Sequence, residues 1–239
     1  RFLREDDRLK EAKVLLLGWS EGTMIAPAAA ARGNVPIDAL LLAGYCNDTM
    51  EEILEWQQSG GSGMVFYCQY FDYDGDGTVS KEEFEQDRYG LRDYVGAAFE
   101  EIDADQDGRL TEKDFALLLK ESREAVFRAF ESGDDQWLKA NYGVQLTGAW
   151  YQQHLRFAPN RETLPKLSLP IHIFHGTSDA NVSVQGVYEI QAAFEKLGKD
   201  NLTAHCYEGF DHDLNYMQYI SSGTLPQSFA DIFRICKEL

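Results

Sequence analysis

The stretch Val14–Gly22 constrains the fold of this chain more than any other part of it. It reads Val-Leu-Leu-Leu-Gly-Trp-Ser-Glu-Gly, an apolar run that leads directly into a Gly-x-Ser-x-Gly pattern. The run predicts a buried strand, and the alanine-rich segment after it predicts a helix. We interpret the two glycines beside Ser20 as a sharp turn with no room for a Cβ on either side. The serine hydroxyl is therefore expected at the exposed tip of a strand-to-helix turn.

Residues 13–44 predict a β-α-β unit. Strands are expected over Lys13–Leu17 and Ile37–Gly44, because both runs are apolar on two faces, as strands of buried parallel sheets are. Glu21–Arg32 predicts the connecting helix, with Pro27 inside it. Ligands bind at the carboxyl ends of parallel strands, and Ser20 follows the first strand at that end.

Strand patterns return only near the C-terminus. Leu169–Phe174 and Leu202–Tyr207 predict two further strands, each followed by a helical pattern. Asp179 comes after the first of these strands and His212 after the second. A serine hydroxyl becomes a nucleophile only beside a general base that an acidic group orients. We therefore interpret Ser20 as the nucleophile, His212 as the base and Asp179 as the acid.

The order Ser, Asp, His along the chain resembles that of the α/β-hydrolase superfamily. So do the nucleophile elbow around Ser20, the run Leu-Pro-Ile-His-Ile-Phe-His-Gly-Thr-Ser-Asp, and the Gly-Phe-Asp-His that precedes a C-terminal helix. Gly-x-Ser-Glu-Gly followed by Ile-Ala-Pro is similar to bacterial esterases and to the prolyl-oligopeptidase-like branch of that superfamily. The resemblance covers roughly 1–48 and 166–239 and implies an α/β-hydrolase parallel sheet.

The resemblance also raises three questions. Asp48 follows the strand after the elbow, where a minority of the superfamily has its acid, so it is an alternative to Asp179. The backbone N–H of Glu21 is expected in the oxyanion hole, whereas the family's second donor lies after an earlier strand.

By the resemblance, the N-terminal strands of the sheet are absent from this chain. We expect a complementary N-terminal chain or fragment to complete the sheet, because an open apolar edge promotes aggregation. A stand-alone minimal sheet is the alternative.

The acidic charge is concentrated in the middle of the chain. The formal net charge is −18, and residues 66–135 carry −12 of it, from 20 acidic and 8 basic residues. This charge argues against a nucleic-acid partner. The sequence has no run of 18 apolar residues, so no membrane span is expected. The four cysteines show no Cys-x-x-Cys spacing, which argues against zinc and thiol-redox sites.

The acidic segment contains one calcium-loop pattern twice. Asp72–Glu83 places acidic residues, a turn glycine and an apolar residue where an EF-hand loop needs them. Asp103–Asp114 repeats the pattern 31 residues later, with Asp instead of Glu at position 12. The expected ligand positions are Asp72, Asp74, Asp76, Thr78, Ser80 and Glu83 in the first loop, and Asp103, Asp105, Asp107, Arg109, Thr111 and Asp114 in the second. Position 7 of each loop ligates through its backbone carbonyl.

Two such loops in tandem resemble a paired EF-hand domain, which implies two Ca²⁺ sites. We expect the second site to be weaker or more tolerant of Mg²⁺, because the shorter Asp114 side chain reaches a metal less easily in bidentate mode. Entering helices are expected over Val65–Phe71 and Tyr94–Ile102. Ser59–Gly63 is expected to be a flexible joint before the first of them.

The predicted organisation is an α/β-hydrolase core in two parts, 1–48 and 166–239, around a helical cap insertion, 49–165, with the EF-hand pair at about 64–122. We expect a carboxylesterase-like serine hydrolase that forms an acyl-enzyme from a small-molecule acyl substrate. A prolyl-oligopeptidase-like peptidase or a thioesterase is the alternative enzyme. A calcium-binding module on an inactive hydrolase scaffold is the alternative of another class. Calcium either holds the cap folded, which we favour, or gates access of the substrate.

Overall fold

The computed structural model describes residues 6–7, 9–34, 36–143 and 145–239. Its internal contacts divide the chain into two units. We call 1–49 together with 157–239 the sheet unit, and 50–156 the insertion.

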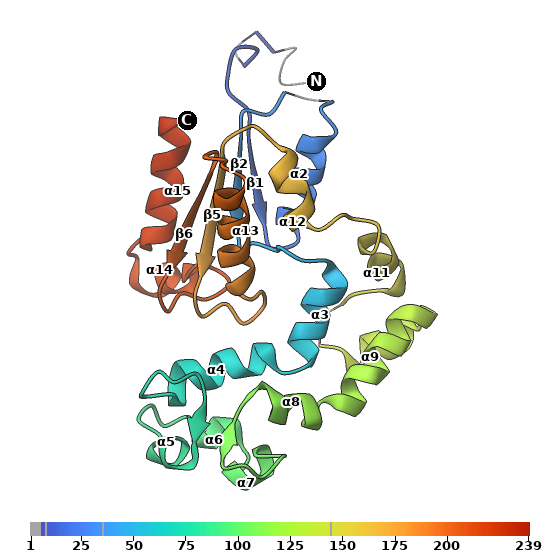
Figure 1. The fold of residues 1–239 in the computed structure, drawn as a ribbon, viewed down its shortest axis with the longest axis vertical. Helices are drawn as coiled ribbons and strands as arrows, with labels where there is room; N and C mark the ends of the chain where they lie inside the picture. The colour runs from blue at the N-terminus through green and yellow to red at the C-terminus, as the bar shows by residue number, and fades with distance from the viewer. Residues whose placement is uncertain (1–5, 8, 35, 144) are drawn as a thin grey trace. The chain divides into compact units, whose positions relative to one another are not determined.

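Four parallel strands form the sheet in the described part of the sheet unit (Figure 1). They are β1 (Leu15–Trp19), β2 (Ala39–Ala43), β5 (Ile171–Gly176) and β6 (Leu202–Tyr207). They pair in the order β1-β2-β5-β6, and every neighbouring pair is parallel. The α/β class with a parallel sheet, predicted from the sequence, is therefore confirmed.

Alternate residues of the central strand β2 belong to two hydrophobic cores. Leu40 and Leu42 pack on one face with residues of α2 and α13, whereas Leu41 and Ala43 pack on the other face with residues of α15. Successive side chains of a strand point to opposite faces, so a strand that is apolar throughout needs cover on both. The helices of this unit are α2 (Gly22–Ala31), α12 (Asn160–Thr163), the 3₁₀ turn η1 (Leu164–Lys166), α13 (Gln185–Lys196), α14 (Tyr216–Ser222) and α15 (Gln227–Glu238).

In its described residues, 50–143 and 145–156, the insertion is helical apart from one short strand pair. Its elements are α3 (Met50–Gln58), α4 (Gly61–Phe71), β3 (Val79–Ser80), α5 (Lys81–Gln86), α6 (Arg92–Val95), α7 (Phe99–Ile102), β4 (Arg109–Leu110), α8 (Glu112–Leu118), α9 (Lys120–Ser132), α10 (Asp135–Asn141) and α11 (Gly148–His154). β3 and β4 are antiparallel, with Val79 opposite Leu110. These two buried residues share a largely aromatic core with Phe71, Phe84 and Phe99.

The prediction of a flexible joint at Ser59–Gly63 is wrong. α4 begins at Gly61, directly after Gly60, which has φ 105°. A Cβ on Gly60 would lie 2.3 Å from Cβ of Phe115, and one on Gly61 would lie 2.0 Å from Nε1 of Trp56. The glycines are therefore needed because the corner between α3 and α4 is closely packed, and they do not make this segment a flexible joint.

The helix predicted over Tyr94–Ile102 is interrupted. Gly96 has φ 69° and ends α6, and α7 begins only at Phe99. A glycine in the left-handed conformation is a common helix terminator, because it carries no Cβ penalty there. α14 was not predicted from the sequence. None of its residues is buried, so its sequence lacks the periodic apolar stripe by which a core-facing helix is predicted.

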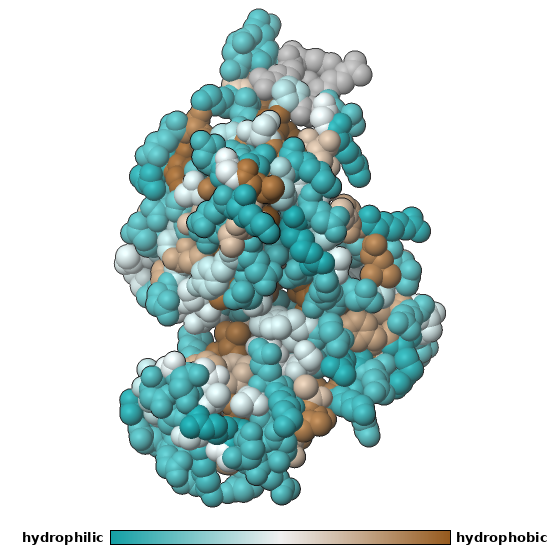
Figure 2. Space-filling model, viewed as in Figure 1, coloured by the Kyte–Doolittle hydropathy of each residue, from teal (hydrophilic) through white to brown (hydrophobic). Residues whose placement is uncertain are grey.

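Hydrophilic residues cover most of the face shown in Figure 2, including the part that holds α5, α6 and α7. Among the described residues, no helix has both the length and the apolar character needed to cross a membrane.

Candidate active site and metal centre

Ser20 occupies the turn between β1 and α2 in the left-handed conformation, with φ 52°. Residues other than glycine rarely adopt it, because Cβ crowds the following carbonyl oxygen. Two backbone hydrogen bonds hold the turn: Ser20 N donates to Ala43 O and Thr23 N donates to Ser20 O, both at 2.8 Å. Backbone strain held in place by the surrounding fold is typical of functional sites.

The two glycines that flank Ser20 differ in whether a Cβ would fit at their positions. A Cβ on Gly18 would lie 2.4 Å from the carbonyl oxygen of Gly22, so the turn closes only with glycine at 18. An added Cβ on Gly22 would meet nothing within 4 Å. The prediction that both flanks exclude a Cβ is therefore wrong for Gly22, because α2 starts there and the position faces open space.

Asn160 locks the serine turn to the end of β2, and no sequence pattern pointed to it. Its amide nitrogen donates to Thr23 O at 2.7 Å and to Cys46 O at 2.8 Å. The Thr23 hydroxyl donates to Ser20 O at 2.7 Å and accepts from Cys46 N at 3.0 Å. Burial raises the pKa of the Cys46 thiol to about 12. The thiol therefore stays neutral and is a poor nucleophile beside the serine turn.

His212 and Asp179 meet beyond the carboxyl ends of β6 and β5. His212 Nδ1 lies 2.8 Å from Asp179 Oδ2. An ionised carboxylate only accepts, so Nδ1 carries the proton and Nε2 is the basic nitrogen. Asp179 is 1% exposed, and its Oδ1 accepts from the N–H groups of Asn181 at 2.8 Å and Val182 at 2.9 Å. The carboxylate is thus fixed where it can orient the imidazole.

Gly44 shows how near the imidazole comes to the serine turn. A Cβ added to Gly44 would lie 2.8 Å from Cε1 of His212. Gly44 directly follows Ala43, whose carbonyl oxygen holds the backbone of Ser20. The serine turn and the imidazole therefore lie against the same end of β2.

The pKa of His212 is raised above its ordinary value of 6.5. Burial disfavours the charged imidazolium, but the hydrogen bond that His212 donates to Asp179 and the negative charge of Asp179 outweigh burial. Asp213 and Asp211 add smaller electrostatic contributions in the same direction.

Of the other acid and histidine considered from the sequence, Asp48 has a different partner, whereas His175 lies near the same acid, with its Nε2 3.4 Å from Asp179 Oδ2. Asp48 forms an ion pair with Arg161 and is about a third exposed. His175 is fully buried; its Nδ1 accepts from Tyr45 N at 2.9 Å and its Nε2 lies 3.1 Å from Val182 O. Both ring nitrogens of His175 therefore support loops, and burial lowers its pKa.

Three carboxylates converge in the first EF-hand loop. Oxygens of Asp72, Asp74 and Asp76 all lie within 4.8 Å of one another. Backbone groups fix them: Gly77 N donates to Asp72 Oδ2 at 2.9 Å, and Thr78 N donates to Asp76 Oδ1 at 2.8 Å. Like charges this close repel unless a cation offsets them, and Ca²⁺ takes oxygen ligands. These residues therefore fit a calcium ion.

The second loop gathers Asp103, Asp105 and Asp114 in the same way. Asp114 is fully buried, although it is the shorter acid at position 12. It accepts from Asp105 N at 3.2 Å and from Thr111 N at 2.9 Å. A buried carboxylate is costly unless it is paired or binds a metal, so the second loop also fits a cation.

The other predicted ligands lie around these two clusters. Glu83 accepts from Ser80 N at 2.9 Å. The hydroxyls of Ser80 and Thr111 donate to the position-12 carboxylates of their own loops, at 2.7 and 3.0 Å. Asp107 accepts from Arg109 N at 2.9 Å. These contacts shape the loops, and they leave the position-9 hydroxyls engaged within the protein.

Two cationic side chains contact the clusters. Arg109 Nη1 lies 2.6 Å from Asp76 Oδ2, and Lys113 Nζ lies 2.5 Å from Asp105 Oδ2. Hydrogen bonds from Thr78 and Arg109 lower the pKa of Asp76 to about 2, and Lys113 lowers the pKa of Asp105. Both carboxylates are therefore ionised at neutral pH.

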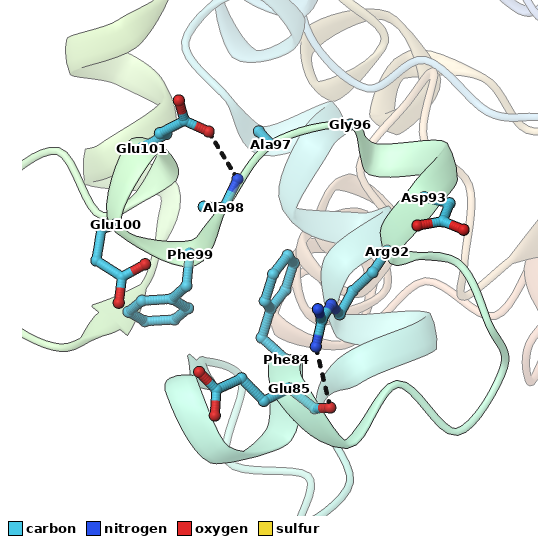
Figure 3. Close-up of a pocket in the computed structure, with 10 residues that line it drawn as sticks. All are labelled: Phe84, Glu85, Arg92, Asp93, Gly96, Ala97, Ala98, Phe99, Glu100 and Glu101. Atoms are coloured by element: carbon cyan, nitrogen blue, oxygen red, sulfur yellow. Dashed lines mark hydrogen bonds between the residues drawn. The ribbon is translucent and has the colours of Figure 1, made fainter.

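Cavities lie in both units, and one of them adjoins the serine site. Figure 3 shows residues of α5, α6 and α7 around a hollow, where Arg92 donates to Glu85 O. The volume of this hollow is about 380 Å³, and the ring centroids of Phe84 and Phe99 beside it are 5.9 Å apart. None of the residues that line it belongs to the serine site. The second cavity, about 300 Å³, lies in the sheet unit and is lined by Trp19, Asp213, Tyr216 and Phe229. Although it is smaller, it includes chain neighbours of both the serine and the base.

An EF-hand family model matches residues 69–86 and 95–119, the segments that hold the two loops. A search of curated proteins gave no match. Among solved structures, the chain is similar to a bromoperoxidase from Bacillus anthracis, at 16% identity over 98% of this chain and 70% of that one, with a TM-score of 0.43.

Two esterases are also among the similar structures. One is a highly thermostable carboxyl esterase from Bacillus coagulans, at 16% identity over 99% of this chain and 67% of that one, with a TM-score of 0.48. The other is from Pyrococcus furiosus, at 12% identity over 93% of this chain and 54% of that one, with a TM-score of 0.42. The chain thus spans 54% to 70% of the length of these three proteins. Its own parallel sheet and serine turn have the layout of the α/β-hydrolase fold.

Proposed function

We propose that this chain is a serine hydrolase of the α/β-hydrolase type that cleaves carboxylic esters. One observation carries the proposal: His212 Nδ1 lies 2.8 Å from Asp179 Oδ2, and the imidazole lies against the end of β2 that holds the Ser20 turn. A hydroxyl on a strained turn, a base and a buried acid are the groups that acyl transfer through serine requires.

In the proposed reaction, His212 Nε2 takes the proton of Ser20 Oγ as this oxygen attacks the ester carbonyl carbon. The backbone N–H of Glu21 donates to the resulting oxyanion at the N-terminus of α2, where the helix dipole favours negative charge. The imidazolium then protonates the leaving alcohol, and the acyl group stays on Ser20. Water attacks the acyl-enzyme while His212 accepts its proton, which releases the acid and restores the serine.

The cavity beside the site supports an apolar acyl group as substrate. Trp19 and Phe229 stack with ring centroids 5.7 Å apart, and Tyr216 lies next to Phe229. Aromatic walls favour apolar groups, and a single carboxylate at Asp213 disfavours an anionic one. We therefore propose a neutral ester with a short to medium acyl chain.

Labelling with a fluorophosphonate tests the proposal. The probe is expected to modify the chain at Ser20, and Ser20→Ala is expected to abolish labelling. Ser222→Ala, on exposed α14, is the matched control and is expected to label normally. Esters of graded acyl length then define the substrate class. Absence of labelling in the folded complete protein, including any piece that completes the sheet, would favour the alternative of a calcium-binding module on an inactive scaffold.

A peptidase of the prolyl-oligopeptidase-like branch and a thioesterase use the same triad chemistry. They differ only in the leaving group, so amide, thioester and oxygen-ester substrates with a common acyl part distinguish the three. Fastest turnover of the oxygen ester is the expected result.

We also propose that the two EF-hand loops bind Ca²⁺, with a structural rather than a gating role. The converging carboxylates of each loop and the family match to both segments support binding. Nothing in the loops points to a second conformation. Hydrolysis measured against free Ca²⁺, on protein shown by circular dichroism to stay folded, tests the role. Activity that rises with Ca²⁺ at constant fold would favour gating.

We further propose that a strand from outside residues 1–239 pairs with β1. Within the described sheet β1 is an edge strand, and its Leu17 is 56% exposed although the strand is apolar. Such an edge invites pairing. Native mass spectrometry of the protein purified from its source tests this: a species of 27 kDa alone would contradict a second piece.

A further inference from the structure

Arg109 belongs to both EF-hand loops at once. It holds position 7 of the second loop and lies opposite Ser80 in the β3–β4 pair. Its side chain crosses to the first loop, where Nη1 lies 2.6 Å from Asp76 Oδ2 and 2.6 Å from Thr78 Oγ1. Lys113, the second cationic side chain in contact with these carboxylates, instead contacts Asp105 of its own loop.

The two oxygens of Asp76 have different partners. Oδ1 accepts from Thr78 N at 2.8 Å and from Thr78 Oγ1 at 2.7 Å. Oδ2 is thus the oxygen that remains for a metal, and it is the one bonded to Arg109. A guanidinium stays protonated in proteins, so an ion that enters the first loop meets a fixed positive charge on one of its ligands.

We propose that Arg109 is a built-in competitor for Ca²⁺ that sets the affinity of the first loop. The inference rests on the proposed calcium site in that loop. Arg109 and Asp76 side chains are 52% and 38% exposed, so their interaction is partly screened by water and salt. At a water-like dielectric, removal of the guanidinium charge is expected to tighten Ca²⁺ binding roughly tenfold.

Isothermal titration with CaCl₂ tests the proposal on the full chain. Asp103→Asn is present in every protein, so that the first loop is observed alone. Arg109→Gln and Arg109→Ala remove the charge, whereas Arg109→Lys keeps it. Arg128→Gln is the matched control: it removes one positive charge from α9, where Arg128 pairs with Glu124.

Both neutral variants are expected to bind Ca²⁺ roughly tenfold tighter than their parent at low KCl, and the difference is expected to shrink as KCl rises. Arg109→Lys and Arg128→Gln are expected to stay within about twofold of the parent. A merely structural role predicts the opposite sign, because loss of Arg109 would then loosen Asp76.

Unchanged or weaker binding in both neutral variants would overturn the role of Arg109 and leave the calcium site standing. Absence of binding in the parent and in every variant would overturn the calcium site, and the inference with it. Ca²⁺ binding that is detected only in the two neutral variants would support the proposal, because Arg109 would then keep the ion out of the first loop of the parent.

Discussion

Asp179 is the residue on which the proposed base depends. It is buried, and its two oxygens are held by backbone N–H groups and by His212. Asp179→Asn presents an amide to Nδ1 of His212 and favours the wrong tautomer of the imidazole. With an ester that the wild-type protein hydrolyses, kcat is therefore expected to fall about 10⁴-fold. Asp48→Asn is the control, because Asp48 pairs with Arg161, and it is expected to change kcat less than about twofold. Similar losses in both variants would contradict the assignment of the acid.

The raised pKa of His212 predicts the pH dependence of activity. The imidazole must be neutral to accept the serine proton, so kcat/KM is expected to rise with pH through a pKa above 6.5. The same shift acts on stability in the other direction. Its contribution is fully present below the unfolded-state pKa and is lost as pH rises through the folded-state pKa. A pH–rate profile with its acid limb below 6.5 would contradict the Asp179–His212 pair as the cause.

Gly18 and Gly22 offer a matched pair of substitutions around the nucleophile. Gly18→Ala would bring a Cβ to 2.4 Å from a carbonyl oxygen, and we expect a loss of about 1–3 kcal/mol in the free energy of unfolding. Gly22→Ala enters open space at the start of α2 and is expected to be neutral or to stabilise by about 0.5 kcal/mol. Urea unfolding measures both. Equal destabilisation would mean that the turn is not closed as the structure shows it.

At the scale of elements, the two metal loops differ at position 12. Glu83→Asp shortens that side chain in the first loop, and Asp114→Glu lengthens it in the second. A longer carboxylate reaches bidentate geometry more easily, so Asp114→Glu is expected to raise the preference of the second loop for Ca²⁺ over Mg²⁺ roughly tenfold. Glu83→Asp is expected to lower that preference in the first loop. Because Asp114 is fully buried, unfolding curves must accompany the titrations with both ions. Unaltered preference in both swaps would contradict position 12 as a ligand.

At the scale of the whole molecule, the charge of the insertion predicts its response to metal removal. Residues 66–135 carry a net charge of −12, and each loop holds carboxylates in contact range. Chelation is therefore expected to destabilise residues 50–156, by about 2.7 kcal/mol per site relative to calcium at 100 times Kd. The insertion contains three of the four tryptophans, Trp56, Trp137 and Trp150, so tryptophan fluorescence mainly follows its melting. A chain with Asp72→Asn and Asp103→Asn should show no effect of chelator, and an equal effect there would contradict calcium binding.

The sequence by itself determined the features whose chemistry is local. The apolar run before Ser20 specified a strand that enters a strained turn. The spacing within each acidic loop specified a set of oxygen ligands for a cation. Residues a few positions apart are held together by the backbone itself, so their pattern is readable without the fold. The parallel sheet followed from runs that are apolar on both faces.

Only the tertiary structure decided which distant groups meet. It paired His212 with Asp179 and Asp48 with Arg161, although both acids follow strands. It also placed Asn160 on the serine turn and Arg109 on the opposite loop, contacts that join residues 137 and 33 positions apart. Such contacts depend on strand order and on loop pairing, which arise from packing of the whole chain. No local pattern encodes them, because the energy that fixes them is shared among elements far apart in the sequence.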